Sequence, residues 1–518
     1  MAKSHNVFLV VLILIPAAIH FFLLNKFLVN FPSWSDDFIY LDLIDKFDNN
    51  SWHERLTKIF AFHNSIHRIA FSRTLLLLYF KIIGNINFKV IIILANLQWI
   101  AILWVIYKYL KREQLSNWYL VGVSVLLFSV NGNLDNYGLI GVLQHLSSIL
   151  CMVLISYGLI YKPNHIWPLF ITLLYPFVST EGLLFIFWVL CYLYFTKSRF
   201  RATFTILFTL LFVFYFRDYE GDSSIISKAD YLGKIYLFLK GILVFLGSSL
   251  KHNVSAAWMI GLFIIAYCGY YIWQTISEKI ALKSTARLFP LFLFVQTLMT
   301  GALIAIGRVL IGGEASLQLL LADRFYTYGA FLLVILYLML IVDLKNRSFL
   351  KPAYYLILAS IFGIFSFSNA QTRLFDLKNR VSLDASNAFL FKKSANYILT
   401  SRDSYLLSNA GVYDFPAEII ELTLGKLKIS DGKKLTLEKQ DQIDSQIGQY
   451  KILNSSVLER TTNVHVVYLE SGSNPKAGIL IPIVQINQGR DHIIKVHVKG
   501  FDYTKPFTAY LINLDLTL

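Results

Sequence analysis

The sequence VFLVVLILIPAAIHFFLLNKFLV at residues 7–29 is apolar over a length that can cross a bilayer as one helix. It is too long for the apolar core of a typical signal peptide, and no small-residue cleavage site precedes Trp34, so we interpret it as a retained helix. The next run, WSDDF at residues 34–38, puts Asp36 and Asp37 where the chain leaves the membrane. A carboxylate at this edge is costly, and membrane proteins keep one there for an ion path, a proton relay or catalysis. These residues predict chemistry at a membrane surface.

The composition indicates a polytopic membrane protein. Of the 518 residues, 56% are hydrophobic and only 15% are charged, and the mean hydropathy is +0.57, which lies outside the range of soluble globular domains. The three cysteines, Cys151, Cys191 and Cys268, all lie inside apolar segments. We therefore expect no disulfide bonds.

The formal net charge of +15 is concentrated in the apolar part of the chain. Residues 370–518 carry 18 Lys or Arg and 15 Asp or Glu, which leaves 29 basic and 17 acidic residues for residues 1–369. Such an excess is typical of basic loops on one membrane face. We interpret it as a topology signal and expect no nucleic-acid partner.

Apolar runs of membrane-helix length predict about eleven spans. They lie at 7–29, 88–107, 117–131, 138–160, 165–179, 181–196, 201–216, 255–275, 288–311, 321–343 and 352–369. Two further apolar stretches, 69–84 and 235–250, contain Arg73, Lys81 and Lys240, and we interpret them as interfacial or re-entrant helices.

The basic residues predict the orientation. With Lys3 on the cytoplasmic side, every loop assigned to that side is basic. These loops are 108–112, 162, 197–201, 279–287 and 345–351. Of the 17 acidic residues in residues 1–369, only Glu113, Glu278 and Asp343 then lie inside. Residues 30–87 become the first extracytoplasmic loop, in which 38–47 has the pattern of an amphipathic helix on the membrane surface.

After residue 369 the hydropathy drops, and about 150 residues follow on the outward side. Residues 376–400 fit a helical connector. Strand-like runs at 464–468 and 493–498 and turn signals at 471–475 and 488–491 predict antiparallel strands beyond it. The predicted fold is therefore a polytopic α-helical membrane domain over residues 1–369 and a soluble, mainly β domain over 370–518.

The first outward loop contains a cluster of histidines and arginines. His63 and His67 are four residues apart, so on a helix they share a face, and Arg68 and Arg73 follow them. Arginine suits bidentate recognition of phosphate, and a histidine pair at this spacing also suits a metal, although no carboxylate or third histidine is close in sequence. Three interpretations stay open: contact with a phosphate or substrate, a metal site, and a purely structural interfacial helix.

Three further candidates lie at predicted outward ends of spans. Glu181 is either part of a helix N-cap box with Ser179 or Thr180, or faces a substrate. The run LADRFYTYG at 321–329 opens a span. Its Arg324 either clamps a lipid phosphate beside Tyr326 or is neutralised by the adjacent aspartate. His145 is either a hydrogen-bonded packing residue or part of the same outward site.

Sequence signatures of soluble catalysis are absent. The chain contains no Walker pattern, no GxGxxG after a strand, no HExxH, no CxxC and no GxSxG. We therefore expect that cytosolic nucleotide does not drive its activity.

The layout resembles the GT-C class of integral-membrane glycosyltransferases across nearly the whole chain. Members of that class have an inside N-terminus, an acidic pair after the first helix, interfacial helices in the first outward loop, about eleven spans and a soluble outward C-terminal domain. The motifs that carry the resemblance are Asp36-Asp37, His67-Arg68 and Asp323-Arg324-Phe325-Tyr326. The C-terminal domain matches no subfamily pattern, which leaves the acceptor open.

The resemblance implies transfer of a sugar from a polyprenyl-phosphate carrier to a glycan, lipid or protein acceptor on the outer side of a bacterial cytoplasmic membrane. An acceptor hydroxyl needs a carboxylate base, and the departing lipid phosphate needs positive charge. We therefore expect Asp36 or Asp37 to be the base of an inverting displacement. The donor phosphate is assigned to Arg324, Arg68 and Arg73, and substrate contacts to His63, His67, Glu181, Tyr326 and His145. No cofactor or metal ligand is assigned, and a divalent metal requirement stays open.

Other activities compete with this hypothesis. A transporter or lipid flippase is disfavoured because the charged residues cluster near one face, and because no pair of Gly- or Pro-broken helices recurs in the two halves. A polysaccharide polymerase or ligase is expected to have a large late outward loop and no β tail. A non-catalytic assembly protein is the third alternative.

Overall fold

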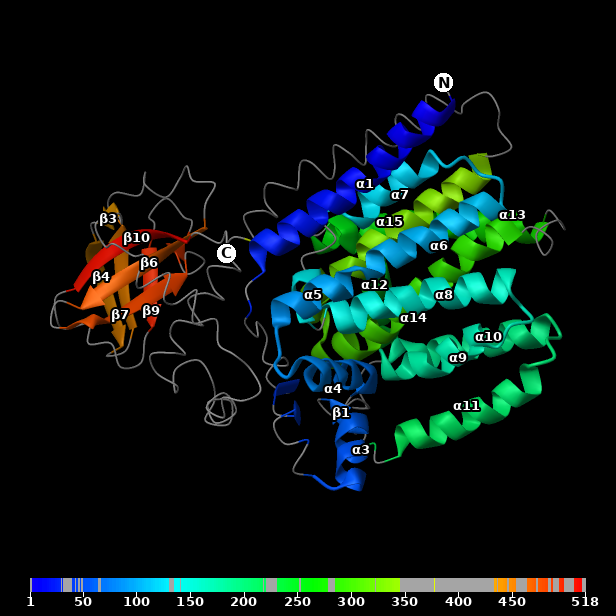
Figure 1. Ribbon diagram of the computed structural model, residues 1–518, viewed down its shortest axis with the longest axis horizontal. Coiled ribbons are helices and arrows are strands. Elements are labelled where there is room, and N and C mark those ends of the chain that lie inside the picture. Colours follow the sequence, from blue (N-terminus) through cyan, green and yellow to red (C-terminus); the bar gives the residue numbers. More distant parts are fainter. Residues whose placement is uncertain are drawn as a thin grey trace. The chain divides into compact units, whose positions relative to one another are not determined.

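The computed structural model of the chain describes most of residues 2–344 and, beyond them, Leu377 and strand segments between residues 433 and 514 (Figure 1). Within 2–344, the residues outside this description are 29, 31–39, 42, 45–46, 48–49, 64–66, 130–134, 140, 218, 220–230, 251–252, 278–284 and 322. The chain forms two compact units, one of residues 1–21, 51–75 and 92–370 and one of residues 22–50, 76–91 and 371–518.

Helices and short helical turns make up most of the described residues before residue 345. The first of them are α1 (Ala2–Phe27), α3 (Trp52–Phe60), α4 (Ala70–Ile83), α5 (Phe88–Asn96), α6 (Gln98–Arg112), α7 (Tyr119–Leu127), the 3₁₀ turn η2 (Asp135–Tyr137), the π-helical turn η3 (Gly141–Leu146) and α8 (Ser147–Tyr161). The remaining ones are α9 (Trp167–Leu174), the 3₁₀ turn η4 (Tyr175–Phe177), α10 (Glu181–Phe195), α11 (Arg201–Phe216), α12 (Tyr231–Leu246), the 3₁₀ turn η6 (Ser248–Leu250), α13 (Val254–Ser277), α14 (Thr285–Gly312), the 3₁₀ segment η7 (Glu314–Leu321) and α15 (Asp323–Leu344).

Among the described residues, six helical stretches are long and apolar enough to cross a membrane. They are Val7–Phe27, Phe88–Arg112, Gly141–Tyr161, Val254–Ile276, Thr285–Leu310 and Phe325–Asp343. Each coincides with a predicted span, so the prediction of a helical, multi-pass membrane protein is confirmed. Three shorter apolar helices, Trp167–Phe177, Glu181–Phe195 and Arg201–Phe216, coincide with three more of the predicted runs.

Two predicted spans are not borne out as spans by the described residues. The run at 117–131 contains α7, which has only nine residues and is shorter than a bilayer requires. The run at 352–369 lies outside the described residues, as does the predicted connector at 376–400 apart from Leu377. The interfacial stretch at 69–84 coincides with α4, and the one at 235–250 overlaps α12 and η6.

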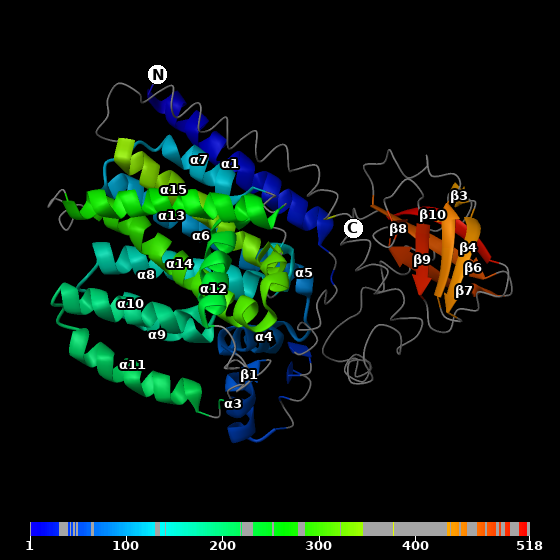
Figure 2. The ribbon, with the colours of Figure 1, turned by 180° about the vertical axis from the view of Figure 1, so that it is seen from behind.

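The described helices pack closely through small residues and aliphatic side chains. In the first unit, α8 packs against both α6 and α14, and these helices lie side by side in Figures 1 and 2. Where α12 contacts α13, added side-chain bulk at Gly247 would overlap the main chain of Ala257, and at Gly261 that of Leu243. Such close backbone approach through small residues is typical of helix packing in membranes, where apolar lipid weakens the hydrophobic drive.

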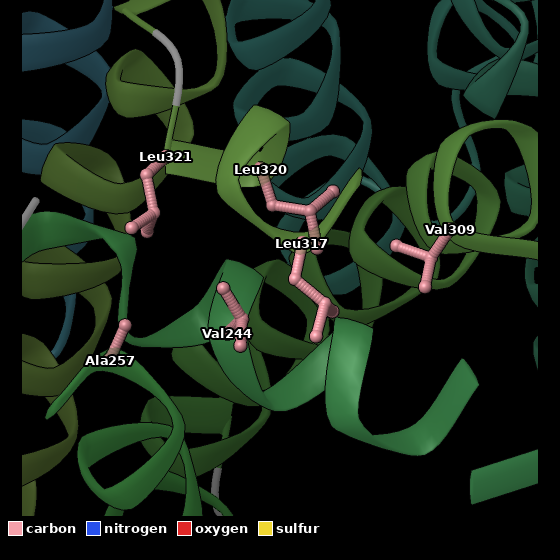
Figure 3. Packing of buried hydrophobic residues seen from close by; sticks show 6 residues of the cluster. All are labelled: Val244, Ala257, Val309, Leu317, Leu320 and Leu321. Atoms are coloured by element: carbon pink, nitrogen blue, oxygen red, sulfur yellow. The ribbon is translucent and has the colours of Figure 1, made fainter. Parts of the chain in front are cut away.

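A cluster of buried aliphatic side chains joins α12, α13, α14 and η7. Figure 3 shows its six members, which converge from these four elements. They are Val244, Ala257, Val309, Leu317, Leu320 and Leu321, each no more than 3% exposed. The cluster fixes η7, and therefore the point from which the chain enters α15.

The strands of the second unit form two antiparallel four-stranded sheets. One has the order β3 (Lys433–Leu435), β10 (Phe507–Leu514), β6 (Val464–Ser471) and β7 (Asn474–Pro482). The other has the order β4 (Leu437–Asp444), β5 (Ile447–Ile452), β9 (Ile493–His497) and β8 (Ile486–Asn487). The strand-like run predicted at 464–468 falls in β6, and the one at 493–498 overlaps β9.

Candidate functional site

The histidine pair lies on a hairpin, so the interpretation that placed it on an interfacial helix is wrong. Strands β1 (Phe62–His63) and β2 (His67–Arg68) are antiparallel, with His63 directly opposite His67. Their ring centroids are 5.2 Å apart. The sequence between the strands includes Asn-Ser at 64–65, residue types that favour turns over helix. The two rings therefore meet as a cross-strand pair instead of along a helix face.

The buried guanidinium of Arg68 is occupied by main-chain carbonyls. Its Nε donates to the carbonyl of Tyr215 at 2.9 Å, and its two Nη atoms donate to the carbonyls of Phe60 and Arg217. The guanidinium also lies over the ring of Phe62, 4.0 Å from the centroid. These contacts fasten the hairpin to the end of α3 and the end of α11, and they favour a structural role for Arg68.

Arg73 plays a similar part at the C-terminus of α3. Its Nη1 donates to the carbonyls of Lys58 and Ile59, at 3.1 Å each, and to that of Ala61. The last carbonyls of a helix lack helical partners and carry negative partial charge, so a buried arginine there stabilises the helix end. A donor-phosphate role for Arg68 and Arg73 stays a prediction, and their described hydrogen bonds support structural roles.

The N-terminus of α3 is fixed by a capping box. The Glu54 carboxylate accepts from the Ser51 N–H at 2.7 Å and the Ser51 hydroxyl at 2.9 Å. These hydrogen bonds hold the pKa of the Glu54 carboxyl below its ordinary value, so the box is charged and intact at neutral pH. Capped at both ends, α3 is an ordered element of the first predicted loop.

Glu181 is the centre of a buried hydroxyl cluster. Its Oε1 accepts from Ser148 Oγ at 2.7 Å and from Tyr328 OH at 2.5 Å, and its Oε2 accepts from Ser179 Oγ. The residue is only 8% exposed. The N-cap interpretation is wrong in detail, because Thr180 occupies the cap and makes no side-chain cap hydrogen bond. Glu181 does begin α10, as predicted.

The cluster extends to the segment before α10. Ser148 Oγ lies 2.6 Å from Tyr175 OH, and Tyr175 belongs to η4. A Cβ on Gly182 would lie 2.5 Å from the main chain of Tyr175 and Pro176, so only glycine allows η4 to approach α10 this closely. We call Ser148, Tyr175, Ser179, Glu181 and Tyr328 the hydroxyl cluster.

The hairpin and His145 both connect to this cluster. Tyr215 accepts from the Arg68 N–H at 3.2 Å, and its hydroxyl lies near Thr180, the residue before Glu181. His145 packs its ring 5.6 Å from that of Tyr328 and 6.3 Å from that of Phe325. The structure therefore brings Arg68, Glu181 and His145 to one region. The outward position of that region stays a prediction.

The wide turn η3 carries His145 into this region. A π-helical turn disturbs the regular hydrogen bonds of a helix. Here the Val142 carbonyl accepts from Gln98 Nε2 at 3.1 Å and from Ser147 Oγ at 3.2 Å, and the Leu143 carbonyl accepts from Ser72 Oγ at 3.3 Å. Neighbouring side chains thus satisfy the carbonyls of the turn, as burial in an apolar medium requires.

The start of α15 is held from a second direction. Tyr326 OH donates to the carbonyl of Ser249, so this tyrosine is engaged with η6. Arg324 is the second residue of α15 and stands one turn before Tyr328. The two predicted bases, Asp36 and Asp37, lie outside the described residues, so their place relative to the hydroxyl cluster stays a prediction.

The opposite ends of these helices meet in a second polar group. The Glu113 carboxylate accepts from Tyr161 OH at 2.7 Å and from Thr285 Oγ at 2.6 Å, and so joins the end of α6, the end of α8 and the start of α14. Arg199 donates to the carbonyl of Asn164 at 3.1 Å. Four loops predicted to be basic and cytoplasmic, those at 108–112, 162, 197–201 and 279–287, therefore meet at the same end of the bundle, which we call the basic end.

An ion pair extends the basic end to α13 and α15. Arg287 Nη2 lies 3.1 Å from Asp343 Oδ1, Tyr267 OH donates to Asp343 Oδ2 at 3.1 Å, and Arg287 Nη1 donates to Gln274 at 3.2 Å. In α15, Asp343 stands fifteen residues after Tyr328. At 1.5 Å per residue the basic end and the hydroxyl cluster are therefore about 22 Å apart along that helix.

The buried charges of the described residues lie at these two ends. The buried Asp, Glu, Lys and Arg side chains among them are Arg68, Arg73, Glu181 and Arg287. Polar groups in between are uncharged, such as Gln296, which donates to Ser156 at 3.2 Å. Within the part of the chain that the structure describes, no group of three or more His, Cys, Asp or Glu side chains could hold a metal ion.

No protein-family model matches this chain, and comparisons with curated proteins and with solved structures find no match.

Proposed function

We propose that this chain is a GT-C-type glycosyltransferase of a bacterial cytoplasmic membrane. It moves a sugar from a polyprenyl-phosphate donor to a glycan, lipid or protein acceptor outside the cytoplasm. In this proposal the chain has about eleven spans with a cytoplasmic N-terminus, and residues 370–518 form an outward β domain. The active site lies at the end of the bundle that contains the hydroxyl cluster.

One observation favours the proposed enzyme over a transporter. The four buried charged side chains among the described residues lie at the two ends of the bundle, Arg68, Arg73 and Glu181 at one end and Arg287 at the other. Secondary transporters bind substrate and coupling ions near the midplane of the bilayer. An enzyme acting on a lipid headgroup needs its polar groups at one membrane face, where the phosphate and sugar of the donor lie.

The basic end supports the orientation. Basic residues lie beside the contacts that join these loops. The basic run at 108–112 directly precedes Glu113, Lys162 directly follows α8, and Lys197 precedes Arg199. Basic loops stay on the cytoplasmic side. The hydroxyl cluster then lies on the outward side, where a polyprenyl-linked sugar and an envelope acceptor meet.

The proposed reaction needs a base and a cation. Asp36 or Asp37 takes the proton of the acceptor hydroxyl, whose oxygen forms a new bond to the anomeric carbon of the sugar. The bond from that carbon to the phosphate oxygen breaks, and its electron pair leaves with the polyprenyl phosphate, stabilised by Arg324. The attack comes from the side opposite the leaving group, so the anomeric configuration inverts.

The test compares Asp36→Asn and Asp37→Asn in purified protein in nanodiscs. The donors are polyprenyl-phosphate hexose and pentose, and the readout is release of polyprenyl phosphate with sugar-modified acceptor identified by mass spectrometry. A positioned base contributes about 10²- to 10⁴-fold. We expect one variant to lose activity by that factor and the other to stay partly active. Glu54→Gln, which neutralises another carboxylate of the same predicted loop, is the matched control.

Full activity in both aspartate variants would show that neither residue is the base. If the wild-type protein releases no polyprenyl phosphate from any donor, yet moves a lipid-linked sugar between the leaflets of proteoliposomes, the chain is a flippase and the enzyme proposal is wrong.

A further inference from the structure

We propose that Glu181 is a positioning residue: through Tyr328 it holds the first turns of α15, and with them Arg324, against α8 and α10. The assignment rests on the proposed function, because Arg324 is placed there at the donor phosphate. It replaces the expectation from sequence that Glu181 contacts the substrate itself.

The contacts of Glu181 carry this inference. One carboxylate accepts from Ser148 of α8, from Tyr328 of α15 and from Ser179 just before α10. Through Ser148 it also reaches Tyr175 of η4. Three helices that are separate in sequence, α8, α10 and α15, are thus joined at a single side chain, and η4 is joined to it through Ser148.

The burial of the hydroxyl cluster favours a positioning role for Glu181 over direct contact with a substrate. Tyr175 is 0% exposed, Tyr328 is 1% exposed, and Glu181, which accepts from Tyr328 and from Ser148, is 8% exposed. The hydroxyl donors therefore enclose the carboxylate and leave little of its surface for a sugar or phosphate. Hydrogen bonds to an ionised group are shorter and stronger than neutral ones, so a carboxylate suits a junction of several hydroxyl donors.

The geometry of α15 connects this junction to Arg324. Arg324 and Tyr328 are four residues apart, about 6 Å along a helix, and occupy the same side of it. On another side, Tyr326 donates to the Ser249 carbonyl, and a Cβ on Gly329 would lie 2.6 Å from Ser248 Oγ. The first two turns of α15 are therefore held by the hydroxyl cluster and by η6. Loss of the hydrogen bond from Tyr328 to Glu181 removes one of these two attachments.

The first part of the test does not depend on activity. Amide hydrogen exchange over residues 323–332 is measured for Glu181→Gln, Tyr328→Phe and the control Ser156→Ala, which removes a buried α8 hydroxyl outside the cluster. We expect exchange at least about 10-fold faster in the first two variants and no change in the control. Tyr328→Phe keeps the ring and removes only the donor, so it serves if Glu181→Gln does not fold. Unchanged exchange in Tyr328→Phe would overturn the positioning role.

The second part is a double-mutant cycle on binding of polyprenyl phosphate. We expect Tyr328→Phe to raise the Kd about 10-fold in the wild-type background and to have no further effect when combined with Arg324→Ala, while the acceptor KM stays the same. Equal effects in both backgrounds would show that Tyr328 does not act through Arg324. If the wild-type protein does not bind polyprenyl phosphate, the proposed function is wrong, and the exchange result still decides whether Glu181 holds α15.

Discussion

The guanidinium of Arg68 donates to carbonyls of α3, of α11 and of the residue after α11. Its planar fork can reach several acceptors in fixed directions, whereas a lysine ammonium is a compact point charge. A structural role for Arg68 depends on the planar geometry of its guanidinium. A role in attracting a phosphate depends on its positive charge, which lysine would keep.

Arg68→Lys separates these two roles. We expect the variant to lose about 2 kcal/mol of stability, because charged hydrogen bonds to buried carbonyls are lost. The measurement is the thermal midpoint of monodisperse protein in detergent, with exposed Arg201→Lys as the control. Unchanged stability combined with weaker binding of polyprenyl phosphate would contradict the structural role and support the phosphate role.

At the scale of single residues, the sequence predicts which side chains lie near one another better than it predicts their hydrogen-bond partners. The spacing of His63 and His67 indicated neighbouring rings, and they are neighbours, but across a hairpin. Glu181 is a candidate from sequence because it lies at the predicted outward end between two apolar runs. Its partners Ser148 and Tyr328 were missed because they lie 33 and 147 residues away in sequence. The four-residue spacing of Arg324 and Tyr328 within the run at 321–329 is a local signal that could have pointed to Tyr328.

At the scale of elements, the contact of α12 with α13 depends on two glycines. An added Cβ at Gly261 would overlap the main chain of Leu243, and one at Gly247 would overlap that of Ala257. A main-chain atom cannot turn aside as a flexible side chain can. The two helices would have to separate to admit even a methyl group.

Gly261→Ala and Gly269→Ala form a matched pair on α13. The Gly261 variant should lose about 1–3 kcal/mol or more through overpacking. Gly269 has no atom within 4 Å of an added Cβ, so its variant should be neutral or slightly stabilised by the better helix propensity of alanine. Thermal midpoints of both variants in the same detergent test the packing. Equal midpoints would contradict the close approach of α12 and α13.

The apolar runs predicted where helices form better than how long they are. Six predicted spans are long helices, but the run at 165–179 divides into α9 and the 3₁₀ turn η4, which contains Pro176. Proline has no N–H and disfavours a continuing α-helix. The run at 117–131 becomes the nine-residue α7. Hydropathy cannot mark these ends, because local backbone chemistry and contacts with other helices set them.

At the scale of the molecule, several helices share one direction. The starts of α8, α10 and α15 meet at the hydroxyl cluster, and α8 and α15 end at residues of the basic end. The start of α14 lies at the basic end, so α14 runs the other way. This alternation brings loops that are predicted to be basic together at one end of the bundle. The membrane face at which that end lies stays a prediction.

Single cysteines test the proposed orientation. In a background with the three native cysteines replaced by alanine, Ala315→Cys should react in intact cells with a membrane-impermeant maleimide, because the proposed topology puts it outside. Asn164→Cys, beside Lys162, should react only after the cells are permeabilised. Both positions are exposed. The reverse labelling pattern would invert the topology and move the hydroxyl cluster to the cytoplasmic side.

The separation of buried charge into two groups also has an electrical consequence. A transmembrane voltage does work only on charge that moves through the field, about 2.3 kcal/mol per elementary charge per 100 mV. Between Glu181 at one end and Arg287 at the other, the described interior has polar groups such as Gln296 and Ser156 but no buried Asp, Glu, Lys or Arg. Among the described residues, no buried charged side chain therefore lies in the middle of the bundle, where a change in membrane potential could move it as a gating charge.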